Sequence, residues 1–199
     1  MTMASINESL FLWLNASGQP DAAIVMLAKL CAQYLIWAIP LSLLSGWLAG
    51  SDNTRARMTE AAVCGLVGLL INQVIGLFWP HPRPFMLGLG HTLIPHAADA
   101  SFPSDHLTLM WAVAWSLLAQ RGTRALGVAL ALIGLPLAWS RIYLGVHFPL
   151  DMVGSLAVAG LSAGLGVGTR NWLSQPVFLL LSRWHQLIFG RLIARGWMR

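Results

Sequence analysis

The sequence predicts an all-α protein: a polytopic bundle of transmembrane helices, with five spans and a sixth left open, flanked by interfacial helices at both ends. Three observations predict this fold class. Hydrophobic residues make up 57% of the 199 positions and charged residues only 10%, against about 25% charged residues in an average soluble domain. The apolar residues form long runs, and the basic residues gather in the short connections between them. The bilayer is therefore the expected solvent.

Five stretches are apolar enough, and nearly all long enough, to cross a bilayer, which takes about 20 helical residues. They are residues 22–48, 58–79, 105–120, 124–140 and 150–168. The third and fourth are short. Apolar residues among polar ones in 1–20 indicate an interfacial helix, and 170–199, which mixes Trp, Leu and Phe with five Arg, indicates another rather than a sixth span. Residues 1–199 are thus expected to form one domain with a transmembrane core at 22–168.

The basic residues indicate how the spans are oriented. With five spans, the connections at 50–57 and 121–124 and the C-terminal tail share one side. That side carries Arg55, Arg57, Arg121, Arg124, Arg170, Arg183, Arg191, Arg195 and Arg199. It is expected to be cytoplasmic, because Lys and Arg are enriched in cytoplasmic loops. On the other side, which includes the long 80–104 connection, the only basic residues are Arg83 and Arg141, so these two suggest a function.

Other classes of protein fit the sequence less well. The net charge of +5 does not indicate nucleic-acid binding, because the basic residues follow membrane topology. Cys31 and Cys64 both lie in apolar runs and are interpreted as packing residues. Residues 1–20 lack the basic start and the cleavage site of a signal peptide, so the first span is expected to direct insertion.

Three segments with polar and charged residues lie at span ends on the side opposite the basic tail. Residues 79–85 follow the second span, residues 101–106 open the third, and residues 140–151 join the fourth to the fifth. Because each segment is at a helix end on the same side, we expect their side chains to form one site.

The residue types in these segments predict a phosphate site. Ser104 is placed to cap the third span, which would leave backbone N–H groups and the positive end of the helix dipole facing the loop. Arg83 and Arg141 add planar guanidinium groups that match two phosphate oxygens each. The expected ligand is a phosphate monoester or the end of a diphosphate.

Two histidines can supply the chemistry of phosphoryl transfer. Imidazole titrates near neutral pH, so one of His147 and His106 can attack while the other donates a proton. Pro149 suits the first position of the fifth helix, which places Asp151 in its first turn. There Asp151 can accept a hydrogen bond from the His147 ring and stabilise the positive charge that develops on it.

These residues resemble the type 2 phosphatidic acid phosphatase superfamily. Its third signature is Ser-Arg, five residues, His, three residues, Asp, and Ser140, Arg141, His147 and Asp151 match it in full. The second signature, Pro-Ser-Gly-His, is present at residues 103–106 with an Asp in the place of Gly.

The first signature is incomplete. It pairs a Lys with an Arg-Pro seven residues later; here Arg83 and Pro84 are present, but Gly76 occupies the Lys position. Within the superfamily, residues 91–106 and 82–85 are similar to the bacitracin-resistance-type undecaprenyl-diphosphate phosphatases, which share the Asp in the second signature.

The resemblance implies a metal-independent, ping-pong hydrolysis that needs no cofactor. His147 would attack the terminal phosphorus, His106 would protonate the leaving phosphate, and water would then cleave the phosphohistidine. Arg83, Ser104 and Arg141 would hold the phosphate oxygens.

The implied substrate is a polyprenyl diphosphate whose tail stays in the membrane lipid. The expected reaction converts undecaprenyl diphosphate to undecaprenyl phosphate and inorganic phosphate, which recycles the lipid carrier of peptidoglycan synthesis and suggests a link to bacitracin resistance. The expected location is the bacterial cytoplasmic (inner) membrane, with the site facing the periplasm or the outer leaflet.

The remaining polar residues of the three segments and their connection are assigned smaller roles. His81 is left open between substrate contact and loop packing, His91 and His96 are expected to order the loop, and Asp99 is expected to make a turn hydrogen bond. Asp105 is counted with the substrate-binding residues, with the hypothesis that its carboxylate raises the pKa of the histidine that follows it.

Three other functions are weighed. A metalloenzyme would need a ligand motif, and none is present. A lipid or ion transporter would need polar residues through the middle of the spans, where such residues are sparse apart from Lys29, Gln33 and Asn72. A broader lipid phosphatase, acting on phosphatidate or phosphatidylglycerol phosphate, would use the same residues and stays open.

Overall fold

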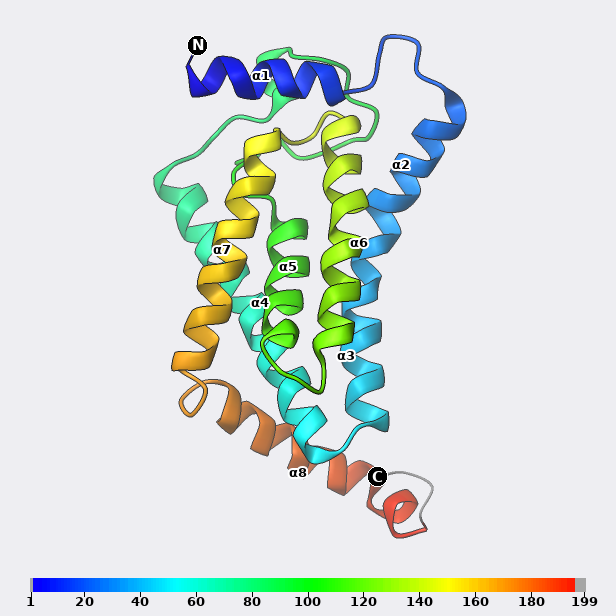
Figure 1. Cartoon of the computed structure of the whole chain (residues 1–199), viewed down its shortest axis with the longest axis vertical. Helices are drawn as coiled ribbons and strands as arrows, with labels where there is room; N and C mark the ends of the chain where they lie inside the picture. The colour runs from blue at the N-terminus through cyan, green and yellow to red at the C-terminus, as the bar shows by residue number, and fades with distance from the viewer. Residues whose placement is uncertain (1, 196–199) are drawn as a thin grey trace.

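The protein is an all-helical bundle, as predicted. Figure 1 shows the computed structural model, which describes residues 2–195; Arg199, counted above with the basic tail, lies outside them. The α-helices are α1 (Met3–Leu14), α2 (Ala22–Tyr34), α3 (Ala38–Ala49), α4 (Asp52–Phe78), α5 (Asp105–Leu118), α6 (Arg124–Tyr143), α7 (Pro149–Gly168) and α8 (Ser174–Ala194). Two 3-10 helices, η1 (Leu35–Trp37) and η2 (Pro84–Leu87), complete the elements of the described residues.

Five helical stretches are long and apolar enough to cross a membrane, but they are not quite the five expected. They are Ala22–Ala49, Asp52–Phe78, Arg124–Tyr143, Pro149–Gly168 and Ser174–Ala194. The expected third span is instead the 14-residue α5, which lies in the centre of the bundle between α4, α6 and α7 (Figure 1). Because protein surrounds α5, it does not need the length of a lipid-facing span. The α8 helix lies obliquely across the lower end of the bundle (Figure 1), as an interfacial helix would.

Two helix boundaries differ from the sequence expectation for local reasons. The first apolar run is divided into α2 and α3 by η1, because Pro40 lacks an N–H and its ring crowds the carbonyl of Ile36. The α4 helix begins at Asp52, because the Ser51 hydroxyl accepts a hydrogen bond from the N–H of Thr54 at 3.4 Å. Residues 52–57 are therefore helical rather than a connection.

The α1 helix lies across the upper end of the bundle, above α6 and α7 (Figure 1). Phe11 is fully buried and packs its ring edge-on against Phe148, with centroids 5.3 Å apart. The Asn7 side-chain oxygen accepts a hydrogen bond from the N–H of Leu150 at 3.0 Å. The predicted N-terminal helix thus covers the first turn of α7.

Asn15, at the end of α1, joins the two connections that carry candidate site residues. Its amide nitrogen donates to the carbonyls of His91 at 2.9 Å and Tyr143 at 3.0 Å, and its oxygen accepts from the N–H of His91 at 2.7 Å. Gly145 allows the close approach, since its φ is +82° and a Cβ there would lie 2.2 Å from the His91 oxygen. The 80–104 connection is thereby fixed against the turn between α6 and α7.

Candidate active site

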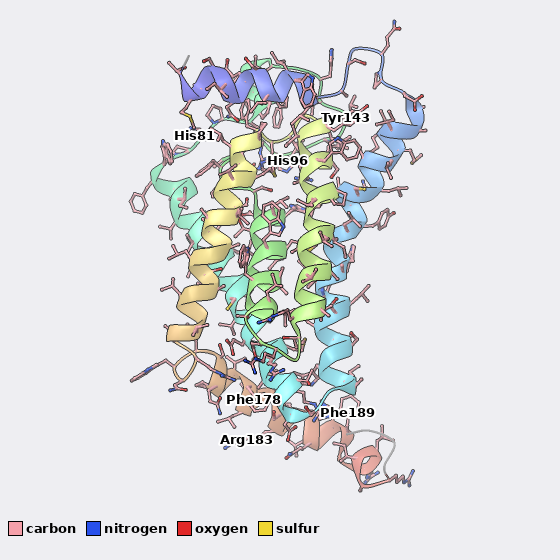
Figure 2. The ribbon with its side chains drawn as sticks, viewed as in Figure 1. His81, His96, Tyr143, Phe178, Arg183 and Phe189 are labelled. Carbon is pink, nitrogen blue, oxygen red and sulfur yellow. The ribbon has the colours of Figure 1, made fainter. Side chains whose placement is uncertain are left out.

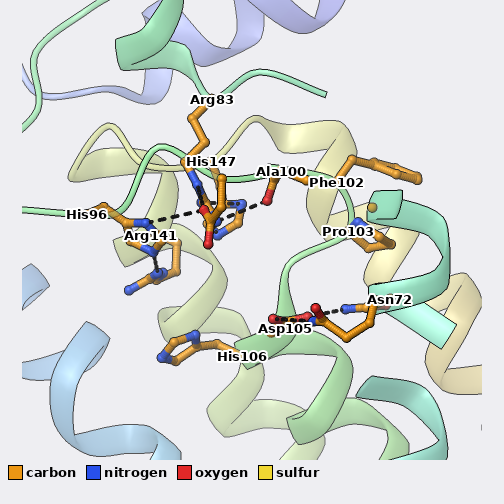
Figure 3. A pocket seen from close by; sticks show the side chains of 13 residues that line it. Asn72, Arg83, His96, Ala100, Phe102, Pro103, Asp105, His106, Arg141 and His147 are labelled. Atoms are coloured by element: carbon orange, nitrogen blue, oxygen red, sulfur yellow. Dashed lines mark hydrogen bonds and ion pairs between the residues drawn. The ribbon is translucent and has the colours of Figure 1, made fainter. Parts of the chain in front are cut away.

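A polar cavity of about 200 Å³ opens at the upper end of the bundle, and all three predicted segments reach it (Figure 3). Of the candidate residues, it is lined by Arg83, Asp105, His106, Arg141 and His147. It is also lined by Asn72, Gln73, Gly76, His96, Asp99, Ala100, Phe102 and Pro103. The structure therefore brings together the three segments that the sequence placed at one side of the membrane.

The His147 ring is held between Asp151 and Arg83. Its Nδ1 lies 3.1 Å from Asp151 Oδ2, and its Nε2 lies 3.0 Å from Arg83 Nη1. Because a guanidinium group can only donate hydrogen bonds, Nε2 must accept, and the ring proton belongs on Nδ1, where it can be donated to Asp151. The arrangement leaves the lone pair of Nε2 on the side of the cavity.

Asp151 is itself fixed by two further hydrogen bonds. The N–H of Phe148 donates to its Oδ2 at 2.8 Å, and the Ser101 hydroxyl donates to the same oxygen. Ser101 is fully buried, and its Oγ also lies 3.4 Å from His147 Nδ1. Sequence reasoning missed Ser101, because fifty residues separate it from Asp151 and neither pattern nor spacing connects them.

The His147 ring is neutral at ordinary pH. Burial, followed by the charges of Arg83 and Arg141, holds its pKa well below the usual value of 6.5. We therefore expect kcat/KM to stay flat as the pH falls through 6.5 and to decline only in more acidic solution, where protonation blocks the Nε2 lone pair. A pH profile of the purified protein tests this, and an acid limb at or above pH 6.5 would contradict it.

All three nitrogens of the Arg83 guanidinium group make contacts that join the segments of the site. Besides His147, it donates to the carbonyls of Val146 at 2.9 Å and Ala100 at 3.2 Å, and its Nε forms an ion pair with Asp99 Oδ1 at 2.8 Å. Burial alone would raise the pKa of Asp99, but the hydrogen bond and charge of Arg83 outweigh it and the pKa is lowered. Asp99 is therefore an ion-pair partner of Arg83, a role beyond the expected turn hydrogen bond.

Arg141, in the last turn of α6, is only partly engaged. Its Nη2 lies 2.9 Å from His96 Nε2, whereas its buried Nε has no hydrogen-bond partner among the described residues. Burial, the largest cause, and the two nearby arginines lower the pKa of His96, so this ring is neutral and can accept from Arg141. His96 is thus a wall of the cavity rather than only a loop-ordering residue.

Ser104 occupies the predicted N-cap position of α5 but does not cap the helix with its side chain. Its Oγ is fully buried and has no partner among the described residues, while its carbonyl accepts from the Ser155 hydroxyl at 2.9 Å. The N–H groups of the first turn are therefore not satisfied by Ser104. Ser104 also does not line the cavity, although Pro103 and Asp105 on either side of it do.

The two residues that follow Ser104 point in opposite directions (Figure 3). Asp105 accepts hydrogen bonds from Asn72 Nδ2 at 2.8 Å and Gln73 Nε2 at 3.3 Å, and the His106 ring extends to the other side of the cavity. The hypothesis that Asp105 raises the pKa of His106 was therefore wrong: burial, followed by the charge of Arg141, lowers that pKa to about 4.

Asn72, Gln73 and Gly76 form one face of the last turns of α4 and line the cavity. Asn72 and Gln73 could have indicated this face from the sequence, because polar residues within a membrane helix generally mark a functional site. Gly76 occupies the position at which the family signature has a Lys. A Cβ added at Gly76 would have Ala100 Cβ as its nearest neighbour, at 3.4 Å.

His81 does not line this cavity. Its ring packs edge-on against Trp79, with centroids 4.6 Å apart, and lies 6.0 Å from the Phe102 ring. Of the two roles left open for His81, the structure favours packing over contact with a ligand in the polar cavity.

Comparison with known proteins gives consistent matches. Residues 58–174 match the family described as the PAP2 superfamily. The chain is 35% identical over 201 residues to the putative undecaprenyl-diphosphatase YbjG of Escherichia coli (strain K12), covering 99% of both chains. It is 39% identical over 187 residues to the undecaprenyl-diphosphatase BcrC of Bacillus subtilis (strain 168), covering 94% of this chain and 95% of that one.

A solved structure has the same fold. The crystal structure of Aquifex aeolicus LpxE aligns with a TM-score of 0.65 and 20% sequence identity, covering 84% of this chain and 99% of that one. At this identity the likeness concerns the arrangement of helices alone.

Proposed function

The chain belongs to the PAP2 superfamily, and from this premise we propose that it is a multi-pass membrane enzyme that hydrolyses undecaprenyl diphosphate to undecaprenyl phosphate and inorganic phosphate. One observation carries the proposal: His147 Nε2 faces a cavity beside two guanidinium groups, and the buried Nε of Arg141, which lines that cavity, has no hydrogen-bond partner among the described residues. An unpartnered buried donor is costly, and a phosphate oxygen would satisfy it. The names of the two relatives described above support a polyprenyl diphosphate as the substrate.

The first proposed step is attack of His147 Nε2 on the terminal phosphorus. In the free enzyme, Arg83 Nη1 donates to this nitrogen, so the incoming phosphate must take over that donation and free the lone pair. The bond between phosphorus and the bridging oxygen then breaks. His106, which is neutral in the free enzyme and takes up a proton beside the negative charge of the bound diphosphate, gives that proton to the departing undecaprenyl phosphate. Asp151 stabilises the positive His147 ring through Nδ1.

In the second proposed step, water cleaves the phosphohistidine. His106, now deprotonated, accepts a proton from the attacking water, and inorganic phosphate leaves with the restored His147 ring. Arg83 and Arg141 hold the oxygens of the phosphoryl group in both steps, and the N–H groups at the start of α5 add to the positive field. Each of these assignments draws on residues of this chain, and no metal is needed to balance the reaction.

The substrate proposal is tested by phosphate release from the purified protein with three lipids: undecaprenyl diphosphate, undecaprenyl phosphate and phosphatidate. We expect kcat/KM for the diphosphate to exceed that for either monoester by at least about tenfold, because a phosphate monoester is a far better leaving group than an alkoxide. Equal rates on all three lipids would instead indicate a broader lipid phosphatase. Transport of a lipid or ion without phosphate release would contradict the enzymatic assignment.

We further propose that the chain resides in the bacterial inner membrane with the cavity facing the periplasm and the α8 tail in the cytoplasmic interface. The supporting observation is the distribution of Arg, which favours the lower end of the bundle. With Cys31 and Cys64 replaced by Ala, a membrane-impermeant maleimide is expected to label Ala98→Cys in intact spheroplasts and Asn53→Cys only after permeabilisation. Both positions are exposed, and the reverse pattern would overturn the orientation.

A further inference from the structure

A second cavity, of about 420 Å³, lies under the N-terminal half of α1 and beside the polar cavity. This volume is in the range of ligand sites, about 300–1,000 Å³. The apolar side chains of Met3, Leu87, Phe102, Phe148 and Leu150 form much of its wall. Figure 2 places His81, another lining residue, below α1 at the upper end of the bundle.

One face of α1 forms the roof of this second cavity. Ala4, Asn7 and Glu8 line it, and Phe11, one turn further along the same face, is fully buried. The helix is anchored at its C-terminal half by Phe11 and Asn15, whose contacts are described above. Its N-terminal half therefore covers an apolar space that the side chains of residues 2–195 leave unfilled.

Phe102 separates the two cavities and lines both of them. Its ring packs against Trp79, with centroids 5.5 Å apart, and lies on Gly154, where a Cβ would come within 2.3 Å of the ring. A ligand with a phosphate end in the polar cavity and an apolar chain attached to it would cross at Phe102.

We propose that the cavity under α1 binds the first isoprene units of the substrate's polyprenyl tail. The inference rests on the proposed function, because it takes the diphosphate end of that lipid to occupy the adjacent polar cavity. Three features select this occupant: the wall is mainly apolar, the cavity shares Phe102 with the anion site, and Trp79 and Leu87 at its edge are more than half exposed, at 57% and 51%. The remainder of the tail continues from this edge into the bilayer.

The α1 helix then has a role in recognising the substrate. Phosphates without a tail gain nothing from the cavity, whereas a polyprenyl diphosphate buries its first units there and is favoured by the apolar surface removed from water. Because the cavity is too small for the whole chain, it recognises the part of the tail next to the diphosphate.

The test fills the roof of the cavity with an aromatic ring. Ala4→Phe is expected to lower kcat/KM for undecaprenyl diphosphate about tenfold, the effect of withdrawing about two methylene groups from burial. The same loss is expected with farnesyl diphosphate, since only the first units are affected. The inhibition constant of inorganic phosphate, which reports on the polar cavity alone, is expected to stay unchanged. The assays use detergent without phospholipid, so that no acyl chain of a membrane lipid can occupy the cavity in place of the tail.

Ser9→Phe is the matched control, because Ser9 is exposed on α1 and does not line the cavity. Leu87→Asp changes the cavity wall from η2 and is expected to lower kcat/KM as Ala4→Phe does. Because Leu87 lies outside α1, this variant separates a change in the cavity from a local effect on the fold of α1. A change in the phosphate inhibition constant parallel to the loss of kcat/KM, or unchanged kcat/KM in both variants, would overturn the inference. Absence of any diphosphate hydrolysis by the unaltered chain would overturn the proposed function and the inference with it.

Discussion

Replacement of His147 by Ala is expected to reduce phosphate release by at least about 10⁴-fold, since removing the nucleophile of a covalent mechanism leaves only binding and electrostatic stabilisation. Its Nε2 faces the cavity, and its other nitrogen is committed to Asp151. The measurement is phosphate release from undecaprenyl diphosphate. His91→Ala provides the control, because His91 carries the same ring at the same end of the bundle, in the 80–104 connection, but does not line the polar cavity.

Trapping the phosphorylated enzyme distinguishes the role of His147 from that of His106. With substrate labelled in the terminal phosphate, the unaltered chain is expected to give a labelled protein on rapid quenching, and His147→Ala to give none. His106→Asn is expected to lose less activity, about 10²–10⁴-fold as for other general acid-base residues, and still to become labelled. Labelling of His147→Ala would remove His147 from the nucleophile's role.

Arg83→Lys is expected to lower kcat by about 10²–10³-fold, a loss comparable with removal of one oxyanion-stabilising donor. Lysine keeps the charge, but a single ammonium group cannot reproduce a fork that contacts His147, Asp99 and two backbone carbonyls at once. Steady-state kinetics with undecaprenyl diphosphate measures the effect.

Arg124→Lys is the matched control for Arg83→Lys. Arg124 is exposed at the other end of the bundle, where its Nε donates to the Leu118 carbonyl, so activity should be unchanged. If Arg83→Lys retained full kcat, the bidentate geometry would be irrelevant and Arg83 would act as a charge alone. A raised KM with unchanged kcat would assign Arg83 to binding of the ground state rather than to catalysis.

Much of the fold and the centre of the site could be predicted from the sequence, because both depend on local patterns. Apolar runs predicted the helices within a few residues at most ends. Pro149 and the four-residue spacing predicted the contact between His147 and Asp151, because Pro149 begins α7 and places Asp151 in its first turn, next to the residues that precede the helix. The match of residues 58–174 to the PAP2 superfamily confirms the family resemblance that three short signatures indicated.

The sequence misjudged features that depend on the surroundings of a helix. Residues 105–120 were expected to form a short span, whereas α5 has 14 residues and is enclosed by α4, α6 and α7. Ser104 was expected to cap α5, but its carbonyl is bonded to Ser155 from α7 and its hydroxyl makes no cap bond. Tertiary packing decided both outcomes.

The sequence by itself predicted the three segments that meet at the polar cavity and the end of the bundle at which they lie, because apolar runs and loop charge are properties of short stretches of chain. Only the tertiary structure decided how Arg83 is held by Asp99, how Arg141 meets His96, and that Ser101 completes the surroundings of Asp151. These contacts join residues 16 to 50 positions apart. Their partners are selected by the way α1 and the 80–104 connection fold over the helix ends, which no local pattern encodes.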